Sequence, residues 1–333
     1  MAKYQIYGIG NALVDKEFEV SEDFLASQGI EKGMMTLIEE DQLHTLLQSL
    51  KDTFGLKKRA GGGSAANTLF AAQYLGAKTF YTCNVANDET GDFYAKDLAA
   101  AGIDTNLHNE REDGVTGRCL VMVTSDAERT MNTYLGITAD LNSSHIHANA
   151  IGESEYLYIE GYLVSSDTAR TAAIECKQIA KEKGIKTAMT FSDPAMVQFF
   201  KPGLEEMLGE DGVDLLFCNE EEALHFADTQ DLEVAKAKLG SVAKSYVITL
   251  GSKGAYIFDG QNGIEVDSHD VKAVDSNGAG DNFAGAFLYG ITAGHSWEEA
   301  GKLASKTAAE VVSNFGPRLE SEAYGQIKTQ ILG

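Results

Sequence analysis

The sequence predicts an α/β fold, in which a doubly wound and mostly parallel sheet carries helices on both faces and a small β-sheet lies beside it. Short apolar runs alternate along the chain with longer amphipathic stretches, which is the order of strands and helices in a parallel sheet. The 34 glycines against 3 prolines favour tight turns inside compact layers. Two further segments alternate apolar with polar residues and have no helix directly after them, which is typical of antiparallel strands.

The elements of the main sheet follow one another in a regular order along the chain. Strands are expected at the short apolar runs, which are residues 4–8, 78–84, 156–160, 186–190, 215–218, 245–250 and 255–258. Helices are expected where longer stretches are amphipathic, which are residues 41–50, 64–74, 91–101, 166–183, 220–226, 232–241, 280–292 and 296–314. Together these elements form one α/β unit.

The two segments without a following helix are residues 14–37 and 117–135. Each begins where a core strand ends or a helix should start, so we expect them to meet as a small sheet over the carboxyl edge of the main sheet. Ligands bind at that edge in open α/β folds, and a sheet covering it would act as a lid. The expected domains are a core, residues 1–13, 38–116 and 136–333, and a β lid, residues 14–37 and 117–135.

The charge of the chain limits its partners. Among 333 residues, 27 Lys and Arg against 50 Asp and Glu give a net charge of -23. Such a surface repels phosphate backbones and anionic lipids, so neither nucleic acid nor a membrane is expected as a partner. A phosphate ligand would need a local positive potential, which backbone amides, a helix N-terminus or a metal ion can supply.

The cysteines and the N-terminus predict a compartment. Cys83, Cys119, Cys176 and Cys218 are widely spaced and form no Cys-x-x-Cys pair, so reduced thiols are expected. The first residues lack the apolar stretch of a signal peptide, and no segment has the ~20 apolar residues of a membrane span. We therefore expect a cytoplasmic protein.

The strongest local signal is the Gly-rich turn at residues 275–281, which reads Asp-Ser-Asn-Gly-Ala-Gly-Asp and opens a small, apolar helix. Gly278, Ala279 and Gly280 let a ligand approach the backbone, and the amides at the helix start can cradle an anion. We expect those amides to hold Asp281 ionised as a general base. The alternative is an ordinary first-turn acid that offsets the helix dipole.

Two further motifs place polar groups at the starts of elements. Residues 61–67 read Gly-Gly-Gly-Ser-Ala-Ala-Asn, where Ser64 can cap the helix and Asn67 offers a donor and acceptors suited to a ribose. At the end of the first strand, Asn11 and Asp15 lie four residues apart. Asp15 can accept hydrogen bonds from a vicinal diol, or it is a solvated turn acid.

A fourth motif follows the apolar strand at residues 215–218. Asn219 and Glu222 lie one turn apart at the start of the next helix. They can hold a hydrated Mg²⁺, which keeps several waters and needs few protein oxygens. The alternative is that acidic residues at this helix N-terminus only compensate the helix dipole.

Several motifs are missing from the sequence. It contains no G-x-x-x-x-G-K-[ST] loop, no H-R-D loop and no complete G-x-G-x-x-G after the first strand, which argues against Walker-type ATPases, protein kinases and ordinary dinucleotide oxidoreductases. The seven histidines form no H-E-x-x-H or comparable set, which argues against a catalytic zinc.

In order and spacing, residues 61–67, 219–222 and 275–281 resemble the marks of the ribokinase-like (PfkB) family of carbohydrate and nucleoside kinases, and the likeness runs through almost the whole chain. Within that family the sequence is most similar to the adenosine kinases. Residues 10–15, Asn277 inside the Gly-rich turn and residues 214–223 carry this closer likeness.

The resemblance implies an ATP- and Mg²⁺-dependent kinase that transfers the γ-phosphate to the 5′-hydroxyl of a nucleoside, with adenosine, giving AMP, as the first candidate. A monovalent cation is an optional further cofactor. The resemblance implies that Asp281 is the catalytic base and that the amides of Gly278, Ala279 and Gly280 form the anion hole. It implies that the ribose contacts Asn11, Asp15, Gly63, Ser64, Asn67 and Asn277. It also implies that Asn219 and Glu222 bind Mg²⁺ through water and lie near the phosphate. The residues that it implies for ATP binding are Asn219, Thr249, Gly251 and Asn314.

Two residues are proposed mainly on chemical grounds. Arg129 can swing over the transferring phosphoryl group and stabilise its charge, or it is a surface hairpin arginine. Tyr162 can stack on a purine, or it only packs. Ser276 stands where the family usually has Thr, which keeps the hydroxyl. Ala65 and Ala66 replace bulkier polar residues of some adenosine kinases, so inosine, guanosine or a free sugar stay open as acceptors.

Two other functions stay open. One is a PfkB sugar kinase acting on ribose, fructose or a related sugar, and the other is a non-catalytic nucleoside-binding sensor. In each case the expected partners are small molecules, and the chain is a monomer or a homodimer.

Overall fold

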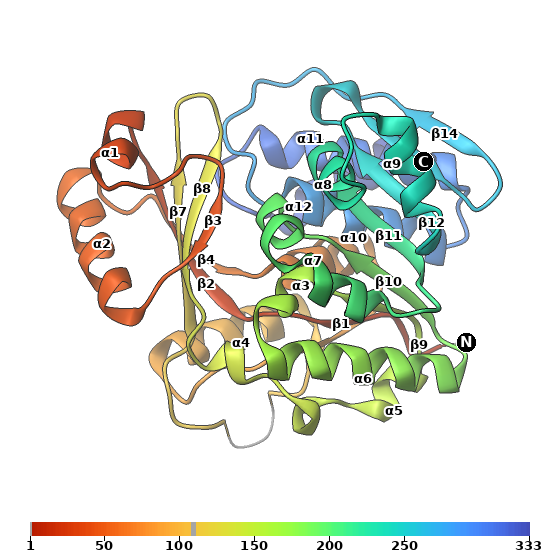
Figure 1. Cartoon of the computed structure of the whole chain (residues 1–333), viewed down its shortest axis with the longest axis horizontal. Coiled ribbons are helices and arrows are strands. Elements are labelled where there is room, and N and C mark those ends of the chain that lie inside the picture. Colours follow the sequence, from red (N-terminus) through yellow and green to blue (C-terminus); the bar gives the residue numbers. More distant parts are fainter. Residues whose placement is uncertain (1, 108–110) are drawn as a thin grey trace.

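The computed structural model describes residues 2–107 and 111–333, which form two sheets with helices packed around the larger one (Figure 1). The main sheet has the strand order β14-β13-β12-β11-β10-β9-β1-β5-β6. Neighbours from β6 to β12 are parallel, whereas β13 and β14 are antiparallel. This confirms the mostly parallel sheet. Its strands are β1 (Tyr4–Ile9), β5 (Thr79–Thr82), β6 (Asp104–Thr105), β9 (Ser154–Ile159), β10 (Lys186–Thr190), β11 (Val213–Asn219), β12 (Ala243–Thr249), β13 (Ala255–Phe258) and β14 (Gly263–Val266).

Helices cover both faces of the main sheet, as expected. Successive strand residues face opposite sides, so Leu215 packs in one apolar cluster and Leu216 in the other. The helices of the first cluster are α3 (Ser64–Leu75), α4 (Glu89–Ala101), α10 (Ala279–Thr292), α11 (Trp297–Val312) and α12 (Ser321–Leu332). Those of the second are α5 (Ala148–Gly152), α6 (Asp167–Lys183), α7 (Pro194–Leu208), α8 (Glu220–Phe226) and α9 (Leu232–Leu239).

Two long helices, α7 and α12, were not expected from the sequence. Helix α7 begins with Pro194 behind the capping side chain of Asp193, and it carries Pro202 and a kink at Phe200. A proline inside a helix removes a backbone hydrogen bond and obscures the helical pattern. Tertiary packing compensates here, because Val197, Leu204 and Leu208 are buried against the sheet.

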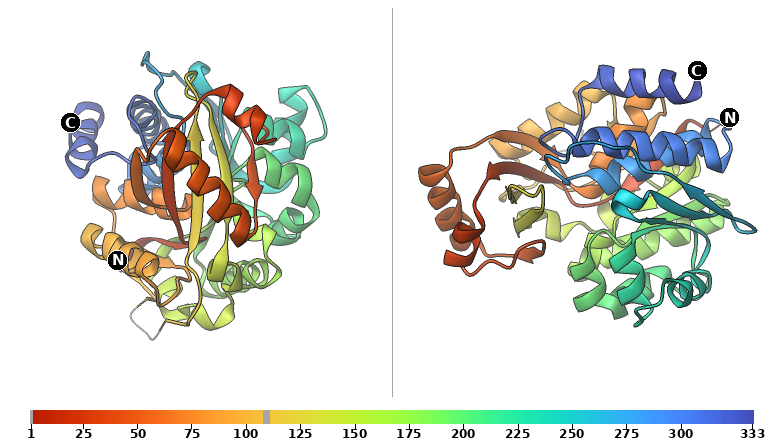
Figure 2. Two further views of the ribbon diagram at one scale, coloured as in Figure 1. Left: turned by 90° about the vertical axis from the view of Figure 1, so that its left-hand side faces the viewer. Right: turned by 90° about the horizontal axis from the view of Figure 1, so that it is seen from above.

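The second sheet stands beside the carboxyl edge of the main sheet, with the order β3-β8-β7-β2-β4 (Figure 1). Helices α1 (Glu22–Ser27) and α2 (Glu40–Thr53) lie across its outer face (Figure 2, left). The expectation of purely antiparallel strands was wrong, since β2 pairs with β7 and β3 with β8 in parallel. Its strands are β2 (Leu13–Glu19), β3 (Met35–Leu37), β4 (Lys58–Gly62), β7 (Gly117–Val123) and β8 (Arg129–Tyr134).

The two segments expected to form the lid supply four of these strands. The fifth, β4, comes from the range 38–116 that was assigned to the core. That range also includes residues 108–110, which lie outside the described residues. The chain therefore crosses between the two sheets at Leu13, at Gly62 and at both ends of the β7–β8 hairpin.

Two expectations about the chain as a whole can be compared with the structure. All four cysteines are free and buried. Over residues 2–107 and 111–333, no helix is both long and apolar enough for a membrane crossing.

Candidate active site

A cavity of about 960 Å³ lies between the carboxyl edge of the main sheet and the inner face of the second sheet. Its floor includes Asn219 at the end of β11, Thr249 at the end of β12 and Glu160 just after β9. Its roof includes Cys119 from β7 and Met131 from β8. The second sheet therefore covers the edge at which a ligand was expected.

The structure brings all but one of the predicted site residues to this cavity. The exception is Asn314, which is exposed beyond the end of α11 and donates a hydrogen bond to the Glu310 carbonyl at 2.8 Å. Its expected contact with ATP stays a prediction. The lining includes Asn11, Asp15, Gly63, Ser64, Asn67, Arg129, Tyr162, Asn219, Glu222, Thr249, Gly251, Asn277, Gly278, Ala279, Gly280 and Asp281.

The Gly-rich turn before α10 is held by Asp275. Its carboxylate accepts hydrogen bonds from the amides of Asn277 and Gly316, both at 2.8 Å. Gly278 has a left-handed φ of 74°, and a side chain there would collide with the Pro317 carbonyl, so only glycine fits. The Ala279 amide bonds the Ser276 carbonyl at 3.3 Å, so one of the three expected anion-hole donors is already used. Among the described residues, the amides of Gly278 and Gly280 make no hydrogen bond and stay available to an anion.

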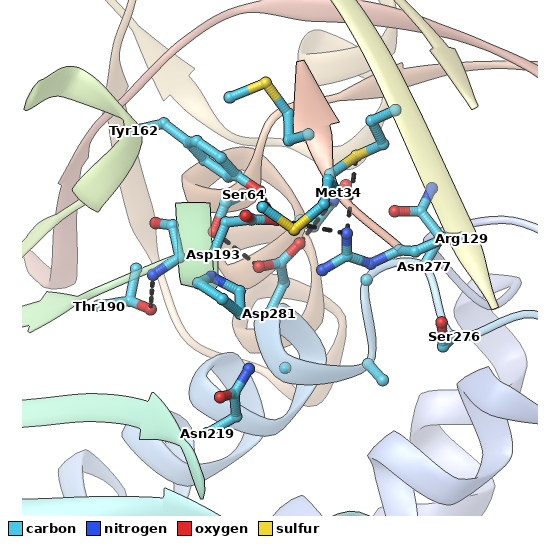
Figure 3. A pocket seen from close by; sticks show the side chains of 18 of the residues that line it. Met34, Ser64, Arg129, Tyr162, Thr190, Asp193, Asn219, Ser276, Asn277 and Asp281 are labelled. Carbon is cyan, nitrogen blue, oxygen red and sulfur yellow. Dashed lines mark hydrogen bonds and ion pairs between the residues drawn. The ribbon is translucent and has the colours of Figure 1, made fainter. Parts of the chain in front are cut away.

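The carboxylate of Asp281 is held from α3 (Figure 3). Ser64 donates its hydroxyl to Oδ1 at 2.6 Å, and Asn67 donates its Nδ2 to Oδ2 at 2.9 Å. Ser64 does not take the alternative role of helix cap, because Gly63 is the N-cap residue and Ser64 is already the first residue of the helix. Burial raises the pKa of Asp281, whereas the hydrogen bonds from Ser64 and Asn67 and the charges of Arg129 and Arg318 act to lower it. Side-chain donors, rather than the amides of α10 alone, therefore favour its ionised form.

Two buried carboxyls lie where the chain crosses from β1 to β2. Glu160 accepts hydrogen bonds from the amides of Asn11 at 3.1 Å and Ala65 at 2.8 Å, so it joins the β1–β2 crossing to the start of α3. Burial raises the pKa of Glu160 to about 8 and that of Asp15 to about 7. Glu160 was not predicted as a site residue, although its place directly after a buried strand at the carboxyl edge was a usable signal.

At the other end of the cavity, Asn219 and Glu222 form a reciprocal cap at the start of α8. The Asn219 side chain accepts from the Glu222 amide at 2.8 Å, and the Glu222 carboxylate accepts from the backbone and side chain of Asn219, both at 3.0 Å. Burial raises the pKa of Glu222 to about 8.

These contacts bear on whether the site fits Mg²⁺. Within the described part of the chain, no three His, Cys, Asp or Glu side chains gather as a ligand set. Mg²⁺ keeps several waters and is often bound through one or two protein oxygens. The two cavity-lining side chains of the cap, Asn219 and Glu222, fit that water-mediated mode and not a closed cage.

Arg129 reaches the cavity from β8 and faces the core (Figure 3). Its guanidinium lies 3.7 Å from the carboxylate of Asp193, which also accepts a hydrogen bond from the Tyr162 hydroxyl at 3.2 Å. Ser192, the residue before Asp193 in the chain, has a φ of 74°. Such a left-handed backbone conformation is costly for a residue with a side chain and is common at functional sites. Arg129 is thus half-buried and paired, not a surface hairpin residue. Asp193 gave no sequence signal because its partners come from β8 and from the turn after β9.

The roof of the cavity is apolar. It includes Met34, Met35, Leu37 and Met131, of which Met35 and Met131 are paired across β3 and β8. Figure 3 shows Met34 over the space next to Tyr162 and Asp281. Thioether side chains pack against aromatic rings with little directional demand. The sequence hid this surface, because these residues come from β8 and from β3 with the residue before it, which lie far apart in the chain.

Comparison with known proteins finds kinases over nearly the whole chain. A profile described as "pfkB family carbohydrate kinase" matches residues 32–323. The solved adenosine kinase of Sinorhizobium meliloti is 35% identical, with a TM-score of 0.93 over 98% of this chain and 100% of that one. A probable sugar kinase from Rhizobium etli is 34% identical, with a TM-score of 0.92 over 98% and 99%. The adenosine kinase of Saccharomyces cerevisiae is 28% identical over 96% of this chain and 98% of its own.

Proposed function

The chain belongs to the pfkB family of carbohydrate kinases, which makes it a phosphotransferase with an alcohol acceptor, and we propose that its acceptor is the 5′-hydroxyl of a nucleoside, with adenosine preferred. The observation that carries this choice is the two-sided cavity. Its polar side offers Asn11 at the end of β1, Asp15 at the start of β2 and Asn67 in α3, and its roof offers Met34 and Met131. A nucleoside has a polar ribose and a flat apolar base to match both sides, whereas a free pentose would leave the thioethers uncovered.

In this proposal the ribose hydroxyls bind Asp15 and Asn277, and the 5′-hydroxyl faces Asp281. Asp281 takes the proton of that hydroxyl as the phosphoryl group is transferred. The free amides of Gly278 and Gly280 donate to the charge on the transferring group, at the positive end of α10.

The donor nucleotide occupies the end of the cavity at Asn219, Thr249 and Gly251. Asn219 and Glu222 would hold Mg²⁺ through water. When bound, the ion neutralises charge on the phosphate oxygens. Arg129, presented by the second sheet, adds a positive charge from the other side, and the sheet itself keeps bulk water away from the reacting groups.

An acceptor panel tests the proposal. ADP release from Mg²⁺ and ATP is measured with adenosine, inosine, guanosine, ribose and fructose, and kcat/KM is compared. We expect the highest value with adenosine. A higher value with ribose or fructose would establish the sugar kinase instead, the activity for which the Rhizobium etli relative is named. No acceptor-dependent release with adenosine, inosine or guanosine would contradict the nucleoside acceptor.

A further inference from the structure

Arg318 lies close to the site but does not line the cavity. It follows α11 in the Gly-Pro-Arg-Leu segment at residues 316–319. Its Nε donates to the Oδ1 of Asn67 at 2.7 Å, and the Nδ2 of Asn67 donates to Asp281 at 2.9 Å. A buried cation is thus joined to the reacting carboxylate through one amide side chain.

This arrangement fixes which way the Asn67 amide faces. A guanidinium has only donors, so it must meet the carbonyl oxygen of the amide. The NH₂ group is then the end that faces Asp281, and an NH₂ group can only donate. A flipped amide would place two donors together at Arg318 and two acceptors together at an ionised Asp281. At the Asp281 end the flip becomes acceptable only when that carboxyl is protonated, and at the Arg318 end it leaves two donors facing each other in either case.

Arg318 is itself held firmly. Its NH1 bonds Asp97 of α4 at 2.8 Å, and its guanidinium lies 3.5 Å from the ring centre of Phe70. Its side chain is only 10% exposed. A side chain on Gly61 would collide with the Asp97 carboxylate, so this glycine near the end of β4 makes room for the pair.

The segment that carries Arg318 is also tied to the helix that carries Asp281. The Asn282 side chain donates to the carbonyls of Pro317 at 2.8 Å and Gly278 at 2.7 Å, and Tyr324 donates to its Oδ1 at 2.6 Å. The Tyr324 hydroxyl in turn accepts from the Leu319 amide at 3.3 Å. The position of Arg318 relative to Asp281 is therefore set by buried contacts on both sides.

We propose that Arg318 is a positioning residue: through the Asn67 amide it keeps both oxygens of Asp281 as hydrogen-bond acceptors and so holds that group in the ionised form that a general base needs. The inference rests on the proposed function for the role of Asp281 as a base. It does not depend on which alcohol is the acceptor.

Other charged and titratable groups face Asp281 and contribute to its titration. They come from the second sheet, from β9 and the residues after it, and from the C-terminal segment. These groups are Asp15 from β2, Arg129 from β8, Tyr158 from β9, Glu160 after it, Tyr162 from the following turn, and Arg318. Among them, Arg318 is joined to Asp281 through a single intervening side chain.

The test is the pH profile of kcat for Arg318→Met, which keeps an apolar stem over Phe70. Activity requires ionised Asp281, so it rises with pH through the pKa of that group. The variant loses the guanidinium that fixes the Asn67 amide and the positive charge near Asp281, and both losses raise the pKa of Asp281. We therefore expect the rising, acid limb of the kcat profile to move to higher pH by about one unit. The loss is then about tenfold at pH values below the limb and small above it. Arg318→Lys, which still only donates, should restore most of the profile.

A matched control is Arg59→Met. Arg59 also pairs with an acid, Glu89, and lies over an aromatic ring, Phe93, but it does not contact Asn67. We expect the acid limb of the kcat profile of Arg59→Met to lie at the same pH as in the parent. In an Asn67→Ala background, Arg318→Met should move the limb less than it does in the parent. An equal loss at every pH, or an unmoved limb, would overturn the proposal.

A second measurement keeps the inference testable without activity. The Asp281 carboxyl is titrated by carbon NMR in the parent and in Arg318→Met, with Asp281→Asn used for assignment. A higher pKa of Asp281 in Arg318→Met supports the positioning role of Arg318 even if no acceptor is phosphorylated, and an unchanged pKa of Asp281 refutes it. If Arg318→Met does not fold, as judged by its thermal unfolding, Arg318→Gln, which removes the cation and can accept as well as donate, takes its place in both measurements with the same expected shift.

Discussion

The two sides of the cavity are built by different forces. At the start of α10, Asp275, Asp281 and Asn282 are each fixed by at least two hydrogen bonds, and the turn has one conformation that glycine alone permits. The facing surface of the second sheet, at Met34 and Met131, offers dispersion contacts that many flat ligands satisfy. On the proposed function, proton transfer belongs to the core, and selection of the nucleoside base belongs to the apolar face of the second sheet.

The largest expected effect is on the core side. Asp281→Asn keeps the shape of the side chain but removes its ability to take a proton. We expect kcat to fall ~100-fold or more while the KM of the nucleoside changes little. Steady-state kinetics of ADP release measure both quantities. Near-normal turnover would show that Asp281 is not the base and that the comparison assigns the chemistry wrongly.

The second effect belongs to the roof. Met34→Ala combined with Met131→Ala removes apolar area that a base would cover, at a cost of about 2 kcal/mol, so kcat/KM for adenosine should fall about 30-fold. The value for any small sugar should stay the same. Met122→Leu, on the outer face of the same sheet, is the control. Equal losses for nucleoside and sugar would mean that the roof supports folding and does not select the acceptor.

The same comparison explains what the sequence could predict. The strand and helix order, the Gly-rich turns and Asp281 are local signals, because each follows from residues adjacent in the chain. Arg318 and Asp193 gave no signal, since their partners Asn67 and Arg129 lie far away in sequence. The parallel pairing of β2 with β7 was missed for the same reason, as it depends on closing a long loop.

A third effect follows from the pKa of Asp15, which burial raises to about 7. A carboxylate that accepts from the ribose hydroxyls must be ionised, so acceptor binding is strong above this pKa and weakens as the pH falls through it. Between pH 8 and pH 6 the acceptor KM should rise up to about tenfold. Asp15→Asn should remove this dependence.

The neighbouring carboxyl of Glu17 helps to identify the source of that dependence. Glu17 is fully buried, burial raises its pKa to about 8, and its oxygens make no hydrogen bond to any described residue. Its titration lies higher in pH than that of Asp15. A KM that falls mainly above pH 8, and does so in Asp15→Asn as well, would therefore indicate Glu17 and contradict the assignment to Asp15.

The smallest effect compares one kind of contact at two places on the core, beside the reacting carboxylate and under the roof. Ser64 and Tyr162 each donate a hydroxyl to a carboxylate, to Asp281 at 2.6 Å and to Asp193 at 3.2 Å. Ser64→Ala should lower kcat about tenfold, because a hydrogen bond to a charged group at the reacting site is lost. Tyr162→Phe keeps the ring that packs beside the base, so kcat and KM should change by no more than about threefold. If Tyr162→Phe were the more damaging change, hydrogen bonds under the roof would matter as much as packing, and the division between the two sides would fail.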